Sequence, residues 1–158
     1  IQPCDLSEIL QSVADEYESL LDKHRLSLVI ETSDVDTRLP VDREKVGVVI
    51  RNLLSNAIKF SPDGGEVRVE LRHTMVVGDN TERTGVCILV KDQGPGIPDA
   101  ELDTVFNKFV QSSRNARQAG GTGLGLAIVR EIVVAHTGTI SACNRDSGGA
   151  CFVLCLPR

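Results

Sequence analysis

The sequence predicts one α+β domain: a mixed, mainly antiparallel sheet with three main helices on one of its faces. The 158 residues suffice for one domain with a real core and are too few for two comfortable ones. A hydrophobic content of 41% beside 25% charged residues is ordinary for a globular protein. Helix-like and strand-like segments follow one another without internal repeats.

The first half of the chain predicts two helices and a strand. Residues 5–23 carry apolar side chains at helical spacing, with Asp5 or Ser7 as N-cap, and 26–31 form a short β-branched strand. A loop then leads to Asp42, which caps a helix over about 43–60. The following "SPDGG" ends that helix.

The second half predicts four strands, a short helix and a long one. Strands over 66–77 and 85–92 are joined by the polar loop "GDNTERTG", and strands over 139–144 and 150–157 flank the turn "RDSGG". Between these pairs come a short helix over 99–109, an unpatterned polar segment, and a long helix that Gly138 ends.

Charge and cysteine content narrow the function classes. The formal charge of −5 and the lack of a basic run argue against a nucleic-acid partner, and no apolar run is long enough to cross a membrane. The five cysteines form no CxxC pair, so we expect small buried hydrophobes in a reducing cytoplasm. They are Cys4, Cys87, Cys143, Cys151 and Cys155.

Three clusters are not explained by packing. Asn52, Asn56 and Lys59 share one side of the 43–60 helix, opposite its apolar side. Asp92 follows an apolar strand in "DQGPGI", where a carboxylate can accept hydrogen bonds from the amine of a base. The glycines of "GGTGLGL" open a helix, which suits phosphate binding. Each cluster alone is about as well explained by capping, turn or packing roles, but their combination is not.

Four motifs carry a resemblance to a family. In order they are "NLLSNAIKFSP", "VKDQGPGIP", "VFNKFVQ" and "GTGLGLAIVREIVVAHTGTI". They closely resemble the N, G1, F and G2 boxes of the catalytic ATP-binding domain of bacterial sensor histidine kinases, in the gyrase, heat-shock chaperone, histidine kinase and mismatch-repair superfamily. The resemblance covers essentially the whole chain, 1–158, and implies a two-layer α/β sandwich of the Bergerat type.

The resemblance implies roles for particular residues. Asp92 would hold the adenine amino group of ATP, Asn56 would ligate Mg²⁺, and Asn52 would support that site. Lys59 would contact phosphate and act in catalysis with Asn52. The remaining nucleotide-binding residues implied by the motifs are Phe60, Gly94, Gly96, Ile97, Phe106, Phe109, Gly121, Thr122, Gly123, Leu124 and Gly125.

The resemblance also implies an ATP lid over about 98–121. Arg114 and Arg117 in this lid would offset the charge that develops during phosphoryl transfer. The segment 107–120 has few apolar side chains, so we expect weak order without nucleotide and closure over the phosphates of ATP.

The phosphoacceptor of such kinases is not visible in the chain. None of His24, His73 and His136 stands in the family's acceptor setting. The resemblance therefore implies a histidine-bearing dimerisation domain of the same protein before Ile1, with a response regulator as indirect partner. We expect the 158 residues alone to be a cytoplasmic monomer with no nucleic-acid or direct membrane contact.

The chain departs from the family pattern at two positions named here, and alternative functions remain. Thr137 and Asn144 replace residues frequent in the family, and we expect neither to touch the site. ATPase clamps and serine kinases of the superfamily have a glutamate where this chain has Asn52, and an amide cannot take a proton at neutral pH. This favours the histidine kinase over those relatives. A nucleotide-sensing module without transfer activity is the other alternative.

Overall fold

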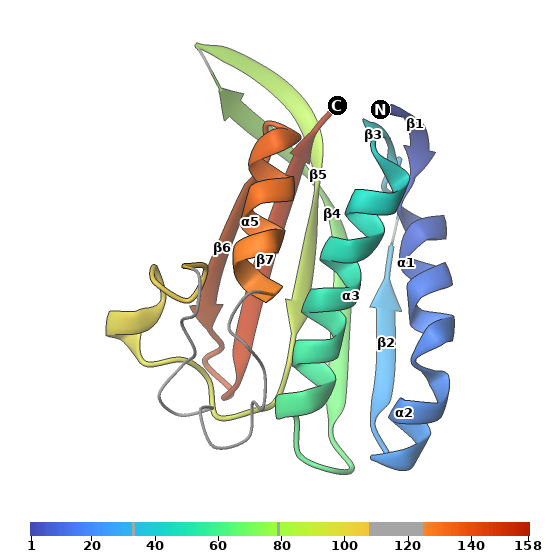
Figure 1. The fold of residues 1–158 in the computed structure, drawn as a ribbon, viewed down its shortest axis with the longest axis vertical. Helices are drawn as coiled ribbons and strands as arrows, with labels where there is room; N and C mark the ends of the chain where they lie inside the picture. Colours follow the sequence, from blue (N-terminus) through green and yellow to red (C-terminus); the bar gives the residue numbers. More distant parts are fainter. Residues whose placement is uncertain (33, 79, 108–124) are drawn as a thin grey trace.

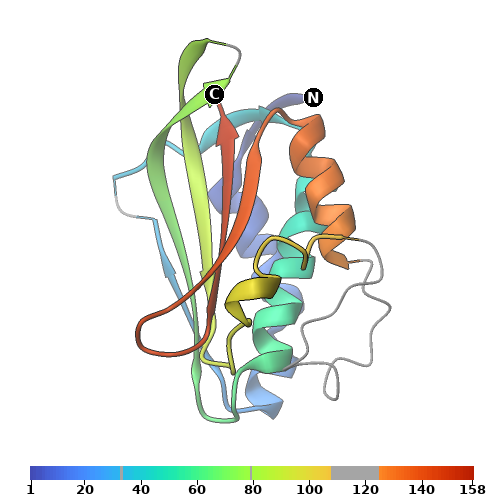
Figure 2. The same cartoon turned by 90° about the vertical axis from the view of Figure 1, so that its left-hand side faces the viewer.

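The protein has two layers, a five-stranded sheet and a layer of helices packed on one of its faces (Figures 1 and 2). The computed structural model describes residues 1–32, 34–78, 80–107 and 125–158. The elements are β1 (Gln2–Asp5), α1 (Leu6–Glu16), α2 (Glu18–Lys23), β2 (Ser27–Glu31), β3 (Arg38–Val41), α3 (Arg43–Phe60), β4 (Glu66–Gly78), β5 (Thr81–Lys91), η1 (Asp99–Glu101), α5 (Gly125–Ala135), β6 (Thr139–Asn144) and β7 (Ala150–Pro157). This confirms the predicted fold class.

The large sheet has the order β2-β4-β5-β7-β6, with β2 parallel to β4 and every other pair antiparallel. Alternate residues of its central strands face the helices, as period-two patterning requires. One buried row across three strands runs through Leu71, Ile88 and Leu154, each 1% exposed. The helices meet this apolar face and close the core.

Helix α3 lies at the centre of the helical layer (Figure 1) and has the predicted bounds. Asp42 caps it by accepting a hydrogen bond from the Lys45 amide (3.1 Å). At the other end Ser61 is extended and precedes a proline, which disfavours further helix. The apolar side predicted from the sequence is buried, which confirms that interpretation; it comprises Val46, Ile50, Leu53, Leu54 and Ala57.

The N-terminal region departs from the prediction in two places. The expected helix over 5–23 divides into α1 and α2 at Tyr17, whose amide bonds back to Ala14 in a tighter turn. In α2, Leu21 is buried and Leu20 is exposed. Strands β1 and β3 replace segments expected to be irregular. They pair antiparallel through Pro3 and Pro40, two residues that argue against strands in a local pattern.

The loop predicted between the strands of residues 66–92 is too long. β4 and β5 pair as far as Gly78 and Thr81, so the polar residues 81–84 belong to a strand. Those residues are exposed, so they show no alternating pattern that would mark a strand in the sequence. The short helix predicted over 99–109 is also wrong for its described part, where the three-residue η1 is followed by turns.

The cysteines do not behave as a set of buried hydrophobes. Cys87 and Cys155 are register partners on β5 and β7 and form a disulfide. Cys143 is exposed and Cys151 is buried, 4% exposed. In the sequence each cysteine taken alone resembles a small hydrophobic residue. Only the strand register shows that Cys87 lies opposite Cys155 and Cys143 opposite Cys151.

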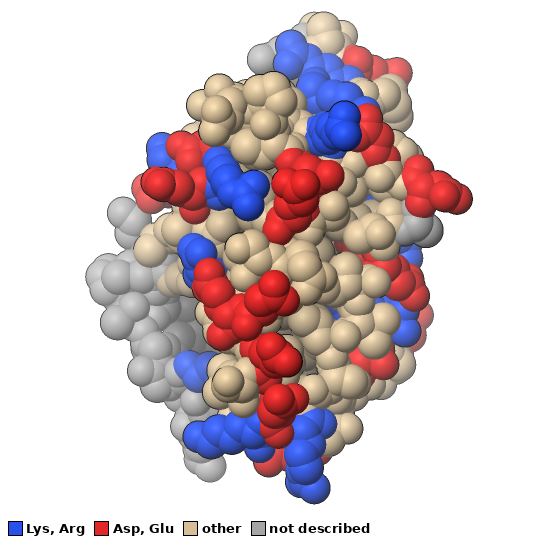
Figure 3. All heavy atoms as spheres, turned by 90° about the vertical axis from the view of Figure 1, so that its right-hand side faces the viewer, with Lys and Arg blue, Asp and Glu red and all other residues tan. Residues whose placement is uncertain are grey.

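The face over α1 and α2 is acidic. Figure 3 shows a band of acidic side chains on this side of the molecule. The exposed acids of the two helices are Glu8, Asp15, Glu16, Glu18 and Asp22. Such a face repels polyanions. Among the described residues, the helices are all too short or too polar to span a membrane.

His136 connects the end of α5 to the start of α3, and we predict that this link stabilises the fold. Its Nε2 accepts from the Asp42 amide (3.0 Å) and its Nδ1 donates to the Ile132 carbonyl (2.8 Å). His136→Phe leaves the Asp42 N–H without its acceptor and should lower the free energy of unfolding by about 1–3 kcal/mol. Urea denaturation measures this. The exposed His73→Phe should cost less than about 0.5 kcal/mol, and equal losses would contradict the link.

Candidate nucleotide-binding site

Asp92 is a buried carboxylate at the end of β5. It is 5% exposed, and its Oδ1 accepts hydrogen bonds from the Gly94 amide (2.9 Å) and the Ala150 amide (3.0 Å). Burial raises the pKa of Asp92, and these two N–H groups oppose the shift only in part. Within the described residues Oδ2 has no hydrogen-bond partner. A buried acceptor without a partner is suited to a donor from a ligand.

The turn between β6 and β7 holds the backbone of Asp92. Arg145 donates from Nη1 to the Asp92 carbonyl (2.8 Å), and the Asp92 amide donates to the Ala150 carbonyl (3.0 Å). Gly149, at φ +94°, lies so close that a Cβ there would come within 2.1 Å of the Asp92 carbonyl oxygen. Three parts of this turn thus fix one residue from another strand.

Asn144 fixes the loop that follows Asp92. Its Oδ1 accepts from the Ile97 amide (2.8 Å), and its Nδ2 donates to the Ile97 carbonyl. The same Oδ1 would lie 2.8 Å from a Cβ at Gly96, which has φ +75°. The expectation that Asn144 does not touch the site is therefore wrong: it positions Gly96 and Ile97. Nothing in the local sequence indicates a contact across 47 residues.

The end of α3 packs against the same loop. A Cβ at Gly94 would lie 2.6 Å from the Phe60 carbonyl oxygen, so only glycine permits this approach. The Gln93 amide donates to Ser61 Oγ (3.3 Å), and Gln93 Oε1 accepts from the Glu66 amide (2.9 Å). Phe60 and Gly94, which were each predicted as nucleotide-binding residues, thus lie next to each other.

The polar stripe of α3 faces the start of α5. Asn52 donates from Nδ2 to the Val48 carbonyl (2.9 Å), and its Oδ1 would be 2.9 Å from a Cβ at Gly125. Asn56 is half-buried and Lys59 exposed, and neither side chain bonds to another described residue. Lys59 Nζ lies 5.7 Å from the centre of the Phe60 ring. An amide oxygen and an ammonium group are thus available on one helix face.

Phe106 packs in the core beside the site. It is 4% exposed, and its ring meets that of Phe152 edge to face at 6.0 Å. Next to it, Asn107 accepts a hydrogen bond from Arg130 of α5 (3.0 Å). The other predicted site residues and most of the predicted lid lie outside the described residues; they are Phe109, Arg114, Arg117, Gly121, Thr122, Gly123 and Leu124.

The β6–β7 turn contributes to the site in a way that was not predicted from the sequence. Arg145, Gly149 and Ala150 all contact Asp92, yet "RDSGG" is expected to be a simple turn. The two adjacent glycines were the available signal, because consecutive glycines permit left-handed backbone and close approach.

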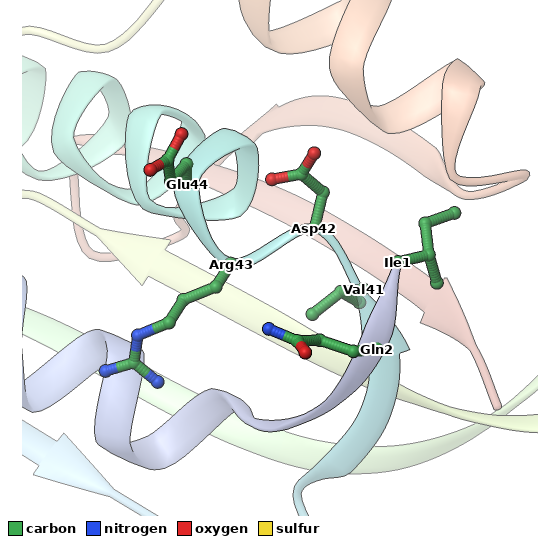
Figure 4. Close-up of a pocket in the computed structure, with 6 residues that line it drawn as sticks. All are labelled: Ile1, Gln2, Val41, Asp42, Arg43 and Glu44. Atoms are coloured by element: carbon green, nitrogen blue, oxygen red, sulfur yellow. The ribbon is translucent and has the colours of Figure 1, made fainter.

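A hollow lies at the opposite end of α3 from Asp92. Figure 4 shows it between the chain start and the first turn of α3, and its volume is about 380 Å³. Its lining residues are Ile1, Gln2, Val41, Asp42, Arg43 and Glu44. None of these belongs to the Asp92 cluster.

Comparison with known proteins agrees with this geometry. The sequence model described as histidine kinase-, DNA gyrase B- and HSP90-like ATPase matches residues 41–158. Hybrid signal transduction histidine kinase D of Dictyostelium discoideum is 38% identical over 154 residues, which cover 97% of this chain and 10% of that protein. The chain thus spans a small part of this relative.

Solved structures show the same fold. The nucleotide-free catalytic domain of histidine kinase ThkA superposes with a TM-score of 0.82 at 27% identity, covering 99% of this chain and 96% of that one. Full-length ShkA in complex with AMPPNP superposes with a TM-score of 0.77 at 26% identity, covering 98% of this chain and 30% of that one.

The two glycines of the turn provide a matched test of the Asp92 contact. Gly148 and Gly149 share φ +94°, but a Cβ at Gly148 would meet nothing within 4 Å. Gly148→Ala should therefore lower the free energy of unfolding by about 1–2 kcal/mol, which is the cost of holding alanine in a left-handed backbone conformation. Gly149→Ala should cost about 1–3 kcal/mol more, because the backbone of Asp92 must move. Urea denaturation compares them, and equal costs would show that the close approach is unimportant.

Asp92→Asn should separate ligand binding from stability. Because the pKa of Asp92 is raised in the folded state, its contribution to stability is greatest at low pH and is lost as pH rises through the folded pKa. Removing the charge should therefore stabilise the fold at neutral pH. The Asn amide can keep the Gly94 and Ala150 contacts through its oxygen, but its NH₂ then faces a ligand amine.

Affinity for ADP should fall by at least about tenfold in Asp92→Asn, since a charged acceptor is replaced by a donor. Calorimetry measures binding, and thermal unfolding at pH 7.5 measures stability. The exposed Asp22→Asn on α2 is the control and should alter neither. Unchanged ADP affinity in Asp92→Asn would remove Asp92 from the site.

Proposed function

Because this chain belongs to the family of histidine kinase-, DNA gyrase B- and HSP90-like ATPases and is similar to the catalytic domains of histidine kinases, we propose that it binds Mg·ATP and donates the γ-phosphoryl group to a histidine on a separate dimerisation domain. The observation that carries the proposal is the Oδ2 atom of Asp92, a buried acceptor with no partner among the described residues.

An adenine amino group matches Asp92 in chemistry, since it is a donor and Oδ2 is an acceptor. It would donate to Oδ2 while the Gly94 and Ala150 amides hold Oδ1. A site built around a buried acceptor rejects ligands that lack the donor, because the acceptor is then left unpaired. The structure of ShkA with AMPPNP supports an adenine nucleotide as the ligand.

The polar stripe of α3 supports a phosphate and metal site. Magnesium typically takes one or two protein oxygens beside phosphates and waters, so the single amide oxygen of Asn56 suffices. When bound, Mg²⁺ would neutralise charge on the phosphates. Lys59 would contact phosphate.

The residues of this chain would position the nucleotide, and Asn52 stands where ATPase clamps and serine kinases of the superfamily have a glutamate as general base. The Asn52 amide is oriented by the Val48 carbonyl and cannot take a proton at neutral pH. Asn52 would therefore not activate a bound water, which favours a nucleophile brought by another domain. Arg114 and Arg117, which lie outside the described residues, would offset charge on the transferred group. Positioning and charge stabilisation account for most of the rate in such transfers.

The phosphoryl group would pass to parts of the protein outside these 158 residues. The histidine would belong to a dimerisation domain before Ile1, and a response regulator would receive the phosphoryl group later. Residues 1–158 would act in the cytoplasm as a monomeric catalytic domain with a lid over about 98–121.

Phosphoryl transfer tests the proposal directly. The 158-residue chain is mixed with γ-labelled ATP, Mg²⁺ and the dimerisation domain of its own full-length protein. Label should appear on the dimerisation domain, and not on His24, His73 or His136. Label on these three histidines at stoichiometric levels, or free phosphate without transfer, would overturn it.

Asn56→Ala should lower the transfer rate by on the order of a hundredfold, since the phosphates lose their alignment. Ser55→Ala changes the neighbouring residue, whose hydroxyl donates to the Asn52 carbonyl, and should transfer at close to the original rate. An Asn56→Ala rate equal to that of Ser55→Ala would exclude Asn56 as the metal ligand.

A further inference from the structure

Four of the five cysteines lie on the face of the sheet opposite the helices, in two cross-strand pairs. Cys87 faces Cys155 and Cys151 faces Cys143, with β7 contributing one member to each pair. The first pair is a disulfide and the second is a pair of free thiols. We infer that Cys143 and Cys151 form a modification site for thiol–disulfide exchange with small disulfides such as oxidised glutathione.

Strand geometry permits the bond. Ala150 exchanges hydrogen bonds with β5 through Asp92, so the next residue, Cys151, directs its backbone groups toward β6. Cys143 and Cys151 are therefore a hydrogen-bonded pair, a type of pair whose Cα atoms are typically about 5.5 Å apart. This separation falls in the usual range of about 4.4–6.8 Å for disulfides.

The two thiols differ in access. Cys143 is exposed, whereas Cys151 is 4% exposed beneath the surface of the sheet. Burial, together with the neighbouring Cys143 thiol, raises the pKa of Cys151 to about 12. Cys143 is thus the point of entry, and Cys151 reacts only with a sulfur already attached beside it.

The exchange has two balanced steps. The Cys143 thiolate attacks one sulfur of the small disulfide, whose S–S bond breaks, and the first small thiolate leaves. The Cys151 thiolate then attacks Cys143 Sγ and displaces the second small thiolate. The protein loses two electrons and two protons, and the disulfide becomes two thiols.

The pair adjoins the residues that hold the Asp92 loop. Cys143 precedes Asn144, which holds Ile97, and Cys151 follows Ala150, whose amide bonds to Asp92. A Cys143–Cys151 disulfide therefore closes the base of the β6–β7 turn. It should slow exchange of the Ala150 and Asp92 amide hydrogens by about tenfold, because a covalent link restricts opening of that turn.

Mass spectrometry after treatment with oxidised glutathione tests the site. Cleavage after Arg145 separates Cys143 from residues 146–158, which carry both Cys151 and Cys155. Cleavage at Arg83 and Lys91 releases the Cys87 peptide, which stays joined to residues 146–158 through the Cys87–Cys155 disulfide. In the original chain the peptides of Cys143 and Cys151 should become joined. Cys151→Ala should instead accumulate glutathione on Cys143, and Cys143→Ala should leave Cys151 free.

Cys4→Ala is the control and should behave like the original chain, since Cys4 lies on β1 and donates to the Val41 carbonyl. A stable glutathione adduct on Cys143 of the original chain, or reaction of Cys151 in Cys143→Ala, would overturn the inference. So would unchanged exchange of the Ala150 amide after the bond has formed. These measurements use no nucleotide, so they can succeed or fail independently of the proposed kinase activity.

Discussion

A buried carboxylate needs hydrogen-bond donors. Most contacts of the candidate site supply donors to Asp92 or hold the segments that supply them. One of its oxygens takes the amides of Gly94 and Ala150, from two segments 56 residues apart. These bonds bring the loop after β5 against the β6–β7 turn, where Arg145 adds a third contact. The other oxygen has no hydrogen-bond partner among the described residues, so a ligand in contact with it would have to bring a donor.

Helix α3 and the Asp92 loop could be predicted because their signals are local. The Asp42 cap, the apolar side of α3 and the glycines around Asp92 each occupy a short stretch of sequence. The β1–β3 pair could not be predicted in this way, since two short strands with opposed prolines have no strand-like pattern. Contacts of the β6–β7 turn with the site depend on strand order, which neighbouring residues do not encode. The sequence resemblance supplied roles for the site, but not the parts of Asn144 and Arg145 in positioning it.

The two faces of the sheet have different chemistry. Leu71, Ile88 and Leu154 pack against the helices, whereas the same strands present ion pairs and thiols on the other side. Glu70 illustrates the second face: it is buried, yet it pairs with both Arg72 and Lys91. Because residues alternate along a strand, β7 can contribute at once to the core, the candidate site and the two cysteine pairs. A shift of its register by one residue would disrupt all three.

Because β7 lies between β5 and β6 in the sheet but comes last in the chain, the sheet is completed only at the end of synthesis. Ala150 begins this strand and completes the hydrogen bonds of Asp92, although Asp92 leaves the ribosome 58 residues earlier. Until β7 is made, β5 has an open edge and the carboxylate lacks one of its two donors. A ligand that requires both hydrogen-bond donors of Asp92 in place can therefore stabilise only a chain whose β7 has already been made.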